Sequence, residues 1–195
     1  MDYSSSGSRR GVRPRRVAVI GVGNPLFGDD GAGYCLVKAL ISCGASGPDF
    51  KALDRIGPGD LSILDGYDYA IFIDAYPARQ SSGQGLAVIE FDSSRLDELE
   101  AATSISMLDP HGIGPLELVV LARSAGVFSG SGVVVAVPAY NLEFASGLSR
   151  PTRESLLKAL EAIVERLRGL SQAIHVDREC VSRWINDNCE RPLID

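Results

Sequence analysis

Two adjacent carboxylates lie in a glycine-rich loop near the start of the sequence. The loop, residues 21–33, reads GVGNPLFGDDGAG and follows the apolar run RVAVI. Such a loop behind a buried strand is typical of phosphate binding. However, the dinucleotide fingerprint needs a third glycine where this chain has Leu26, and the lysine of a P-loop is absent. Because Asp29 and Asp30 would also repel a pyrophosphate, the loop is a poor nucleotide site.

Other polar side chains follow the predicted strands at the points where those strands end. Ligands of doubly wound sheets bind beyond the carboxyl ends of the strands, so these side chains are expected at one edge. Carboxylates and an imidazole gathered there would suit a divalent metal ion. The candidates are Asn24, Asp29 and Asp30 after the first strand, Asp54 near the end of the second, Asp74 at the end of the third, Tyr140 and Asn141 near the end of the fifth, and His111 in a loop.

Each candidate also has a purely structural interpretation. Asp29 is best explained as a cap of the helix that follows, and Asp30 fits a first-turn acid as well as a functional one. Asp54 fits a turn residue equally well. Asp74 ends an apolar strand, where a carboxylate is costly unless it is paired or ligated, so a functional role is favoured. His111 stands between proline and glycine and is therefore not a core residue.

Strands and helices alternate along the chain and would position these side chains. Apolar runs predict strands, and 3.6-residue periodicity with capping signals predicts helices. The clearest helix has one apolar face, formed by Leu156, Leu157, Leu160, Ile163, Val164 and Leu167. The predicted strands are 16–21, 50–56, 68–75, 85–92 and 132–140, and the predicted helices are 29–44, 58–66, 114–126 and 149–170.

This alternation predicts an α/β fold in a single three-layer domain. We expect a twisted, mainly parallel five-stranded sheet with helices on both faces. The link to strand 85–92 is too short for a helical crossover, so this strand should run antiparallel to the third. Residues 1–14 read as a disordered basic leader, 15–170 as the domain, and 171–195 as a C-terminal extension in which Trp184 could serve as an anchor.

Composition narrows the classes of function. The 195 residues carry a formal net charge of −6, which argues against nucleic-acid binding, and the basic cluster at residues 9–16 fits a solvated tail. No apolar run is long enough to span a membrane, and the run behind the twin arginines is too short for an export signal. We therefore expect a cytoplasmic protein. The sequence does not determine the oligomeric state, and a monomer is favoured.

The four cysteines show neither the spacing of a zinc site nor that of a disulfide framework. Cys35 lies among apolar residues and is expected to be a small buried hydrophobe. Cys180 and Cys189 lie in the polar tail, where a disulfide between them is an alternative to the reduced pair expected in a cytoplasm.

Several segments together resemble the hydrogenase maturation proteases. The opening loop resembles that family's GxGNxLxxD[DE]GxG motif, and FIDA at residues 72–75 resembles its acid on the third strand. DPHGIGPLELVVLA at 109–122 resembles its PHxxG segment, and residues 136–167 resemble its closing strand and helix. The resemblance covers residues 16–169 in the family's order.

The resemblance implies an endopeptidase that removes a C-terminal extension from the large-subunit precursor of a [NiFe] hydrogenase. Members of this family act after nickel has been inserted, and the nickel in the precursor is the recognition signal, so no resident cofactor is expected. The residues that would contact nickel, and carry the catalysis, are Asp30, Asp74 and His111. Gly23 would let the substrate tail approach the backbone closely, and Asn24 would either hold the loop or hydrogen-bond the tail. Many relatives carry Glu at the position of Asp30.

The same pattern leaves open a role for Asp54 in substrate binding, because the segment DRIGPGD after it departs from the glycine-rich turn usual in the family. Two other classes also fit the residues. One is a maturation chaperone that binds metal or precursor and does not cut. The other is a general metallopeptidase that holds its own metal through three protein ligands. No HExxH or GxSxG motif favours a resident zinc or a serine nucleophile.

Overall fold

A five-stranded sheet forms the centre of the molecule. The computed structural model describes residues 15–78, 85–95 and 113–193. The strand order is β2-β1-β3-β5-β4, and all neighbours are parallel except β5 and β4. The strands are β1 (Val17–Val22), β2 (Asp49–Leu53), β3 (Tyr69–Pro77), β4 (Ala87–Asp92) and β5 (Ser131–Ala139).

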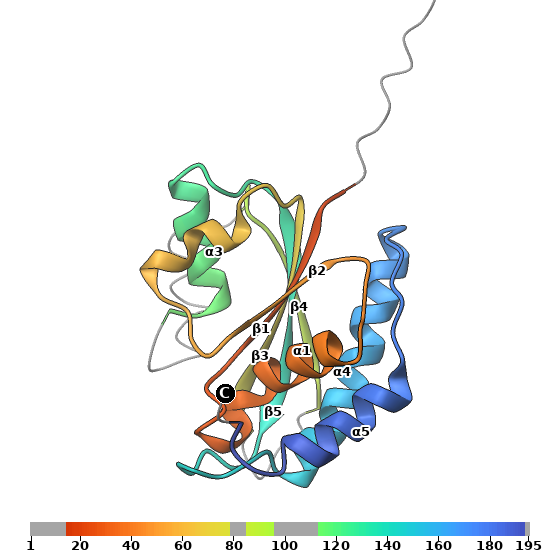
Figure 1. Ribbon diagram of the computed structural model, residues 1–195. Helices are drawn as coiled ribbons and strands as arrows, with labels where there is room; N and C mark the ends of the chain where they lie inside the picture. The colour runs from red at the N-terminus through yellow and green to blue at the C-terminus, as the bar shows by residue number, and fades with distance from the viewer. Residues whose placement is uncertain (1–14, 79–84, 96–112, 194–195) are drawn as a thin grey trace, which may run out of the picture.

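Helices cover both faces of this sheet and complete the predicted three layers (Figure 1). One face carries α1 (Ala32–Ser42), α4 (Arg150–Gly169) and α5 (Arg178–Asn188). The other carries α3 (Pro115–Ser124) and the 3-10 helix η2 (Pro58–Leu64). Because successive residues of a strand point to opposite faces, Val17 and Val19 of β1 join the first core while Ala18 and Ile20 join the second. Burial on both faces explains why the inner strands β1, β3 and β5 are largely apolar, whereas the parallel edge strand β2 is only partly buried and carries Asp49 and Lys51.

The antiparallel direction of β4 is confirmed, and its partner is β5. The backbone pairs run from Ala87 opposite Ala136 to Asp92 opposite Ser131. The fourth strand therefore forms the edge of the sheet, and β5 lies between it and β3. The parallel pairing of β3 with β5 brings the carboxyl end of β5 beside that of β3, which matters for the site below.

Several predicted elements differ from those in the structure. The second strand ends at Leu53 rather than at residue 56, and the short predicted helix 58–66 is the 3-10 helix η2. The first predicted helix is divided into a 3-10 turn, η1 (Gly28–Gly31), and α1. The third strand continues past its predicted end to Pro77, so Asp74 lies within β3 rather than close to its end. The extension pairs with β5 as far as Pro77 opposite Ala139, which supplies hydrogen-bond partners that the sequence does not reveal locally.

The described part of the C-terminal extension, residues 171–193, contains the helix α5. Cys35 is buried as expected, but the prediction of reduced cysteines is wrong. Disulfides join Cys35 to Cys189 and Cys43 to Cys180, so no cysteine of the described chain is free and the pair Cys180–Cys189 does not form. The partners lie more than a hundred residues apart, which is why local spacing gave no signal.

The helix α5 packs against the core through side chains on one face. Val181, Ile185 and Cys189 are buried, and Trp184, the predicted anchor, is half-buried. Within the described ranges, no helix has both the length and the apolar character needed to cross a membrane.

Candidate functional site

The loop between β1 and η1 is held in shape by its own polar groups. The Oδ2 atom of Asp30 accepts a hydrogen bond of 2.7 Å from the backbone N–H of Asn24. Asn24 in turn accepts from Leu26 N–H through Oδ1, at 3.0 Å, and from Phe27 N–H through its carbonyl, at 3.1 Å. The half-buried Asp30 and Asn24 are therefore fixed relative to each other.

Two glycines allow the backbone segments around Asp30 to approach closely. Gly23 has a φ of +130°, and a Cβ there would lie 1.8 Å from the carbonyl oxygen of Asp30. A Cβ on Gly33, in the first turn of α1, would lie 2.1 Å from the carbonyl oxygen of Ile73. The start of α1 therefore lies directly against the backbone of β3 at Ile73, the residue before Asp74. Only glycine fits at these two positions.

Asp74 lies where the sheet becomes accessible at its carboxyl edge. The pairing of β1 with β3 ends at Gly21 opposite Ile73, so Asp74 is the first residue of β3 that is not paired with β1. On its other side Asp74 pairs with Ala136 of β5. The side chain is half-buried, and Oδ1 accepts from the N–H of Ala75 at 2.9 Å.

The element that carries Asp30 contacts the strand that carries Asp74. η1 packs against both β3 and β5, as expected for a loop at the carboxyl ends of parallel strands. The predicted third member, His111, falls outside the described residues. Across the ranges that the structure does describe, no cluster of three His, Cys, Asp or Glu side chains could hold a metal ion. The assignment of these three residues as metal contacts remains a prediction.

The predicted substrate-binding residues divide between the rim and the next strand. Gly23 and Asn24 lie beside Asp30, and the N–H of Gly23 donates to the carbonyl of Leu53 at 3.1 Å. That bond ties the loop to the end of β2. Asp54 directly follows β2 and is exposed, so it belongs to the same edge of the sheet, one strand away from Asp30.

Asp29 has a structural role, but it does not cap the helix that follows it. The N-cap residue of α1 is Gly31, and no side chain caps that helix. The fully buried Asp29 carboxylate instead accepts four hydrogen bonds. The donors are the N–H groups of Tyr140, Asn141 and Ser149 and the Ser149 hydroxyl, at 2.6–2.9 Å. Asp29 thereby anchors the segment between β5 and α4.

Exposed apolar side chains lie on this segment and on the loop that carries Asp30. Phe27 and Phe144 are 41% and 69% exposed, with ring centroids 5.4 Å apart. Tyr140 and Leu142 are exposed as well. We call Phe27, Tyr140, Leu142 and Phe144 the aromatic rim. The sequence signal that could have revealed it is the presence of large apolar residues inside a predicted loop.

A tyrosine follows Asp74 on the same face of β3. The Tyr76 hydroxyl donates to the carbonyl of Gly85 at 2.7 Å. Burial raises the pKa of Tyr76, and the nearby Tyr140 raises it further. The hydroxyl therefore keeps its proton at neutral pH and acts as a hydrogen-bond donor.

These features define an α/β protein with carboxylates on adjoining elements at the carboxyl edge of its sheet. No family model matches the sequence. The chain is 27% identical over 157 residues to the hydrogenase 2 maturation protease of Escherichia coli K12, covering 78% of this chain and 91% of that protein.

Solved structures agree with this relationship. The hydrogenase 2 maturation peptidase of Thaumarchaeota archaeon SCGC_AB-539-E09 is 30% identical, with a TM-score of 0.55, over 78% of this chain and 98% of that one. An Escherichia coli endopeptidase is 25% identical, with a TM-score of 0.63, over 82% and 96%. The chain belongs to the hydrogenase maturation protease family.

Proposed function

We propose that this protein is an endopeptidase that removes the C-terminal extension from the large-subunit precursor of a [NiFe] hydrogenase after nickel insertion. The observation that carries the proposal is the placement of Asp30 and Asp74 on contacting elements, η1 and β3, in a chain of the hydrogenase maturation protease family. Both carboxylates lie at the edge of the sheet where α/β proteins bind ligands.

The nickel ion belongs to the precursor in this proposal, and we assign no resident cofactor to the protease. Asp30, Asp74 and His111 are the proposed contacts to the ion. Carboxylate and imidazole groups are acceptable nickel ligands, and a partly coordinated ion in the precursor would accept them. Recognition then requires both proteins, because neither supplies the full set of ligands alone.

The proposed chemistry is hydrolysis of one peptide bond. A nickel ion can polarise the scissile carbonyl or activate a water molecule, and the carboxylate of Asp30 or Asp74 can accept the proton released. The hydrogen bond from Asn24 N–H holds the Asp30 carboxylate in place. Gly23 and Asn24, which lie beside Asp30, would lie along the substrate tail, and the exposed Asp54 would contact the tail further out.

The aromatic rim supports a macromolecular substrate. Exposed apolar side chains next to a site provide contact area that a small molecule would not need. We propose that the protein is a monomer and that the precursor is its only partner. We further propose a cytoplasmic location. Because the structure has two disulfides, the cytoplasm would have to be one in which such bonds persist, as in hyperthermophiles.

The site assignment is tested by variants in a processing assay with nickel-loaded precursor, read by intact mass. Asp30→Asn, Asp74→Asn and His111→Ala should each lower the cleavage rate by at least about a hundredfold while the circular dichroism spectrum is unchanged. Asp65→Asn is the matched control, because Asp65 is exposed and precedes β3 at the opposite edge of the sheet.

The outcomes separate the three classes of function. Normal turnover by a site variant would remove that residue from the site. Tight binding of precursor without cleavage by the wild type would favour the chaperone. Metal in the purified protein, together with cleavage of short peptides, would favour a metallopeptidase with its own ion.

A further inference from the structure

The C-terminal helix is fastened to α1 at both ends. α1 and α5 run antiparallel, and Cys35 near the start of α1 is joined to Cys189 at the end of α5. Cys43 at the end of α1 is joined to Cys180 in the first turn of α5. Since an α-helix rises 1.5 Å per residue, the two attachments lie about 12 Å apart along α1.

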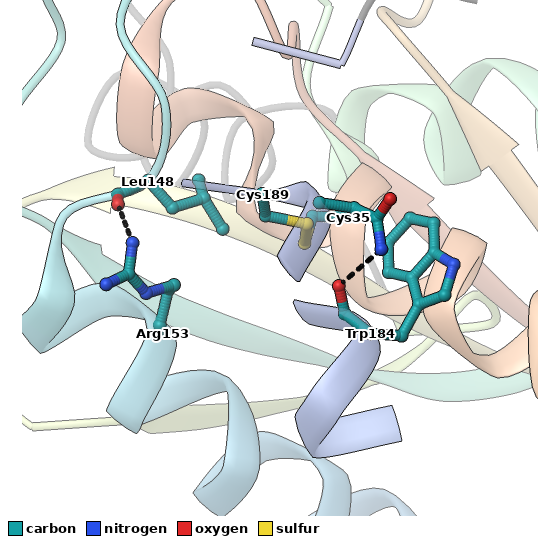
Figure 2. The surroundings of a disulfide bond; sticks show 6 residues. Cys35, Leu148, Arg153, Trp184 and Cys189 are labelled. Atoms are coloured by element: carbon teal, nitrogen blue, oxygen red, sulfur yellow. Dashed lines mark hydrogen bonds between the residues drawn. A yellow bond between two sulfur atoms is a disulfide. The ribbon is translucent and has the colours of Figure 1, made fainter. Parts of the chain in front are cut away.

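The Cys189 end of this arrangement contacts the segment that precedes α4. The N–H of Leu148 donates to the carbonyl of Cys189 at 2.7 Å, and a Cβ on Gly147 would lie 2.3 Å from the carbonyl carbon of Glu190. Arg153 joins both sides, donating to the carbonyl of Leu148 at 3.0 Å and to Glu190 at 3.2 Å. Figure 2 shows Leu148 beside the Cys35–Cys189 disulfide, and the Arg153 guanidinium hydrogen-bonded to the carbonyl of Leu148.

The same segment is bonded to the loop that carries Asp30. Gly28 N–H donates to the carbonyl of Ser146 at 3.2 Å, and Ala145 N–H donates to the carbonyl of Leu26 at 2.7 Å. Asp29 adds its buried carboxylate contacts to Tyr140, Asn141 and Ser149. A cavity of about 10 Å³ at the junction is lined by the loop after β1, by Gly147 and Leu148, and by residues of the C-terminal end. Contacts therefore run without a break from Cys189 to the residue next to Asp30.

The Cys43–Cys180 disulfide, near the start of α5, lies in a different environment from Cys35–Cys189. Cys43 and Cys180 are half-buried, whereas Cys35 and Cys189 are 1% and 2% exposed. Near Cys43 an isolated backbone bridge joins Ser46 to His175. This end of α5 lies beside the C-terminal part of α4, where Val164 and Arg168 share a surface hollow with Cys43.

We propose that the Cys35–Cys189 disulfide positions the site. It fixes the end of α5, which contacts residues 140–149, and these residues in turn contact the loop that carries Asp30. Cys43–Cys180 supplies stability without this positioning role. The effect on cleavage rests on the proposed function, whereas the effect on the order of residues 140–149 does not.

The two disulfides provide a matched comparison. With either bond present, the other closes the same ring, made of residues 35–43 and 180–189. The chain entropy that each removes from the unfolded state in that context is therefore equal. A role limited to this entropy predicts that removing either bond has the same consequences.

The experiment compares the double variants C35A/C189A and C43A/C180A, each of which keeps α5 attached by the remaining bond. Amide hydrogen exchange should accelerate by at least about tenfold at residues 140–149 in C35A/C189A and stay within about twofold of wild type in C43A/C180A. Cleavage of nickel-loaded precursor should fall by at least about tenfold in the first variant and stay within about twofold in the second.

A third variant disturbs the same junction and keeps all four cysteines. Gly147→Ala should reproduce the faster exchange, since its Cβ would collide with the backbone of Glu190. Equal exchange in the two double variants would overturn the proposal, as would faster exchange spread over the whole molecule in C35A/C189A with none in Gly147→Ala. Failure of the wild type to cleave any precursor would refute the proposed function, and the exchange data would still decide the role of the disulfide.

Discussion

Two adjacent aspartates have different roles in this protein. Asp29 is fully buried and accepts hydrogen bonds from a segment more than a hundred residues away, whereas Asp30 is half-buried at the rim. The sequence identified both as candidates because acids are unusual in a glycine-rich loop. It favoured a structural role for Asp29 and, through the family resemblance, a site role for Asp30. It could not identify the groups that Asp29 binds, because the donors come from residues 140–149 and only the folded chain brings them together.

Replacing Asp29 should destabilise the fold. Asp29→Ala would leave buried N–H groups and a hydroxyl without an acceptor, at a cost of roughly 3 kcal/mol in the free energy of unfolding. Urea unfolding measures that cost. Asp30→Asn is the control, because its amide oxygen can still accept from Asn24, and it should unfold within about 1 kcal/mol of wild type. Similar stability of the two variants would contradict the assigned roles.

Gly23→Ala should damage the site locally. The added Cβ would meet the carbonyl of Asp30, and the backbone has a φ of +130°, so the loop must shift. We expect cleavage of precursor to fall by at least about tenfold. As a control, Gly126→Ala also replaces a positive-φ glycine, with a φ of +72° but open space around it, and should leave cleavage unchanged. Equal cleavage by the two variants would show that the close approach at Gly23 is unimportant.

At the scale of elements, helices and strands were predicted correctly where the apolar pattern is strong. They were predicted wrongly where their bounds or position depend on contacts between distant residues. The face of α4 that was predicted to be apolar is buried, apart from the partly buried Leu157. The end of β3 was misplaced because its last residues pair with β5. α5 was not identified as a definite helix, since its mean hydropathy is low and its position depends on two disulfides.

An ion pair between α4 and α5 should make the docking of α5 depend on pH. The Arg178 guanidinium donates two hydrogen bonds to Glu161, at 2.6 and 3.1 Å, and lowers the pKa of that carboxyl. A lowered pKa in the folded state gives stability that is present above the unfolded value and is lost as the pH falls.

Thermal unfolding of the Glu161→Gln variant tests this ion pair. At pH 7 its melting temperature should be lower than that of the wild type by about 2 °C, because an exposed pair contributes little. The difference should disappear on acidification through the folded-state pKa of Glu161. A difference that persists at low pH would mean that the glutamate acts through packing instead.

The two disulfides should open in a fixed order under a mild dithiol reductant. Each reduction transfers two electrons and two protons to the disulfide and converts the dithiol to its own disulfide. Cys43–Cys180 is the more accessible pair and should react first. Alkylation followed by peptide mass spectrometry should detect an intermediate labelled at Cys43 and Cys180 alone. An intermediate labelled at Cys35 and Cys189 would contradict the burial difference between the two bonds.

At the scale of the whole molecule, the class of fold follows from the alternation of strands and helices and from the absence of a linker. The edge position of β4 and the pairing of the cysteines depend on contacts between remote parts of the chain, which one sequence does not specify. The candidate site was found because carboxyl ends of parallel strands share one edge. The full set of metal ligands at this site could not be derived from this chain alone, because in the proposed function the metal arrives with the precursor.

The most direct test is to incubate the wild-type protein with nickel-loaded and nickel-free large-subunit precursor in parallel and to follow both by intact mass. The account predicts loss of a single C-terminal peptide from the loaded precursor only. Equal cleavage of both precursors would contradict it and indicate a peptidase with its own metal, and cleavage of neither would contradict it in favour of a binding protein.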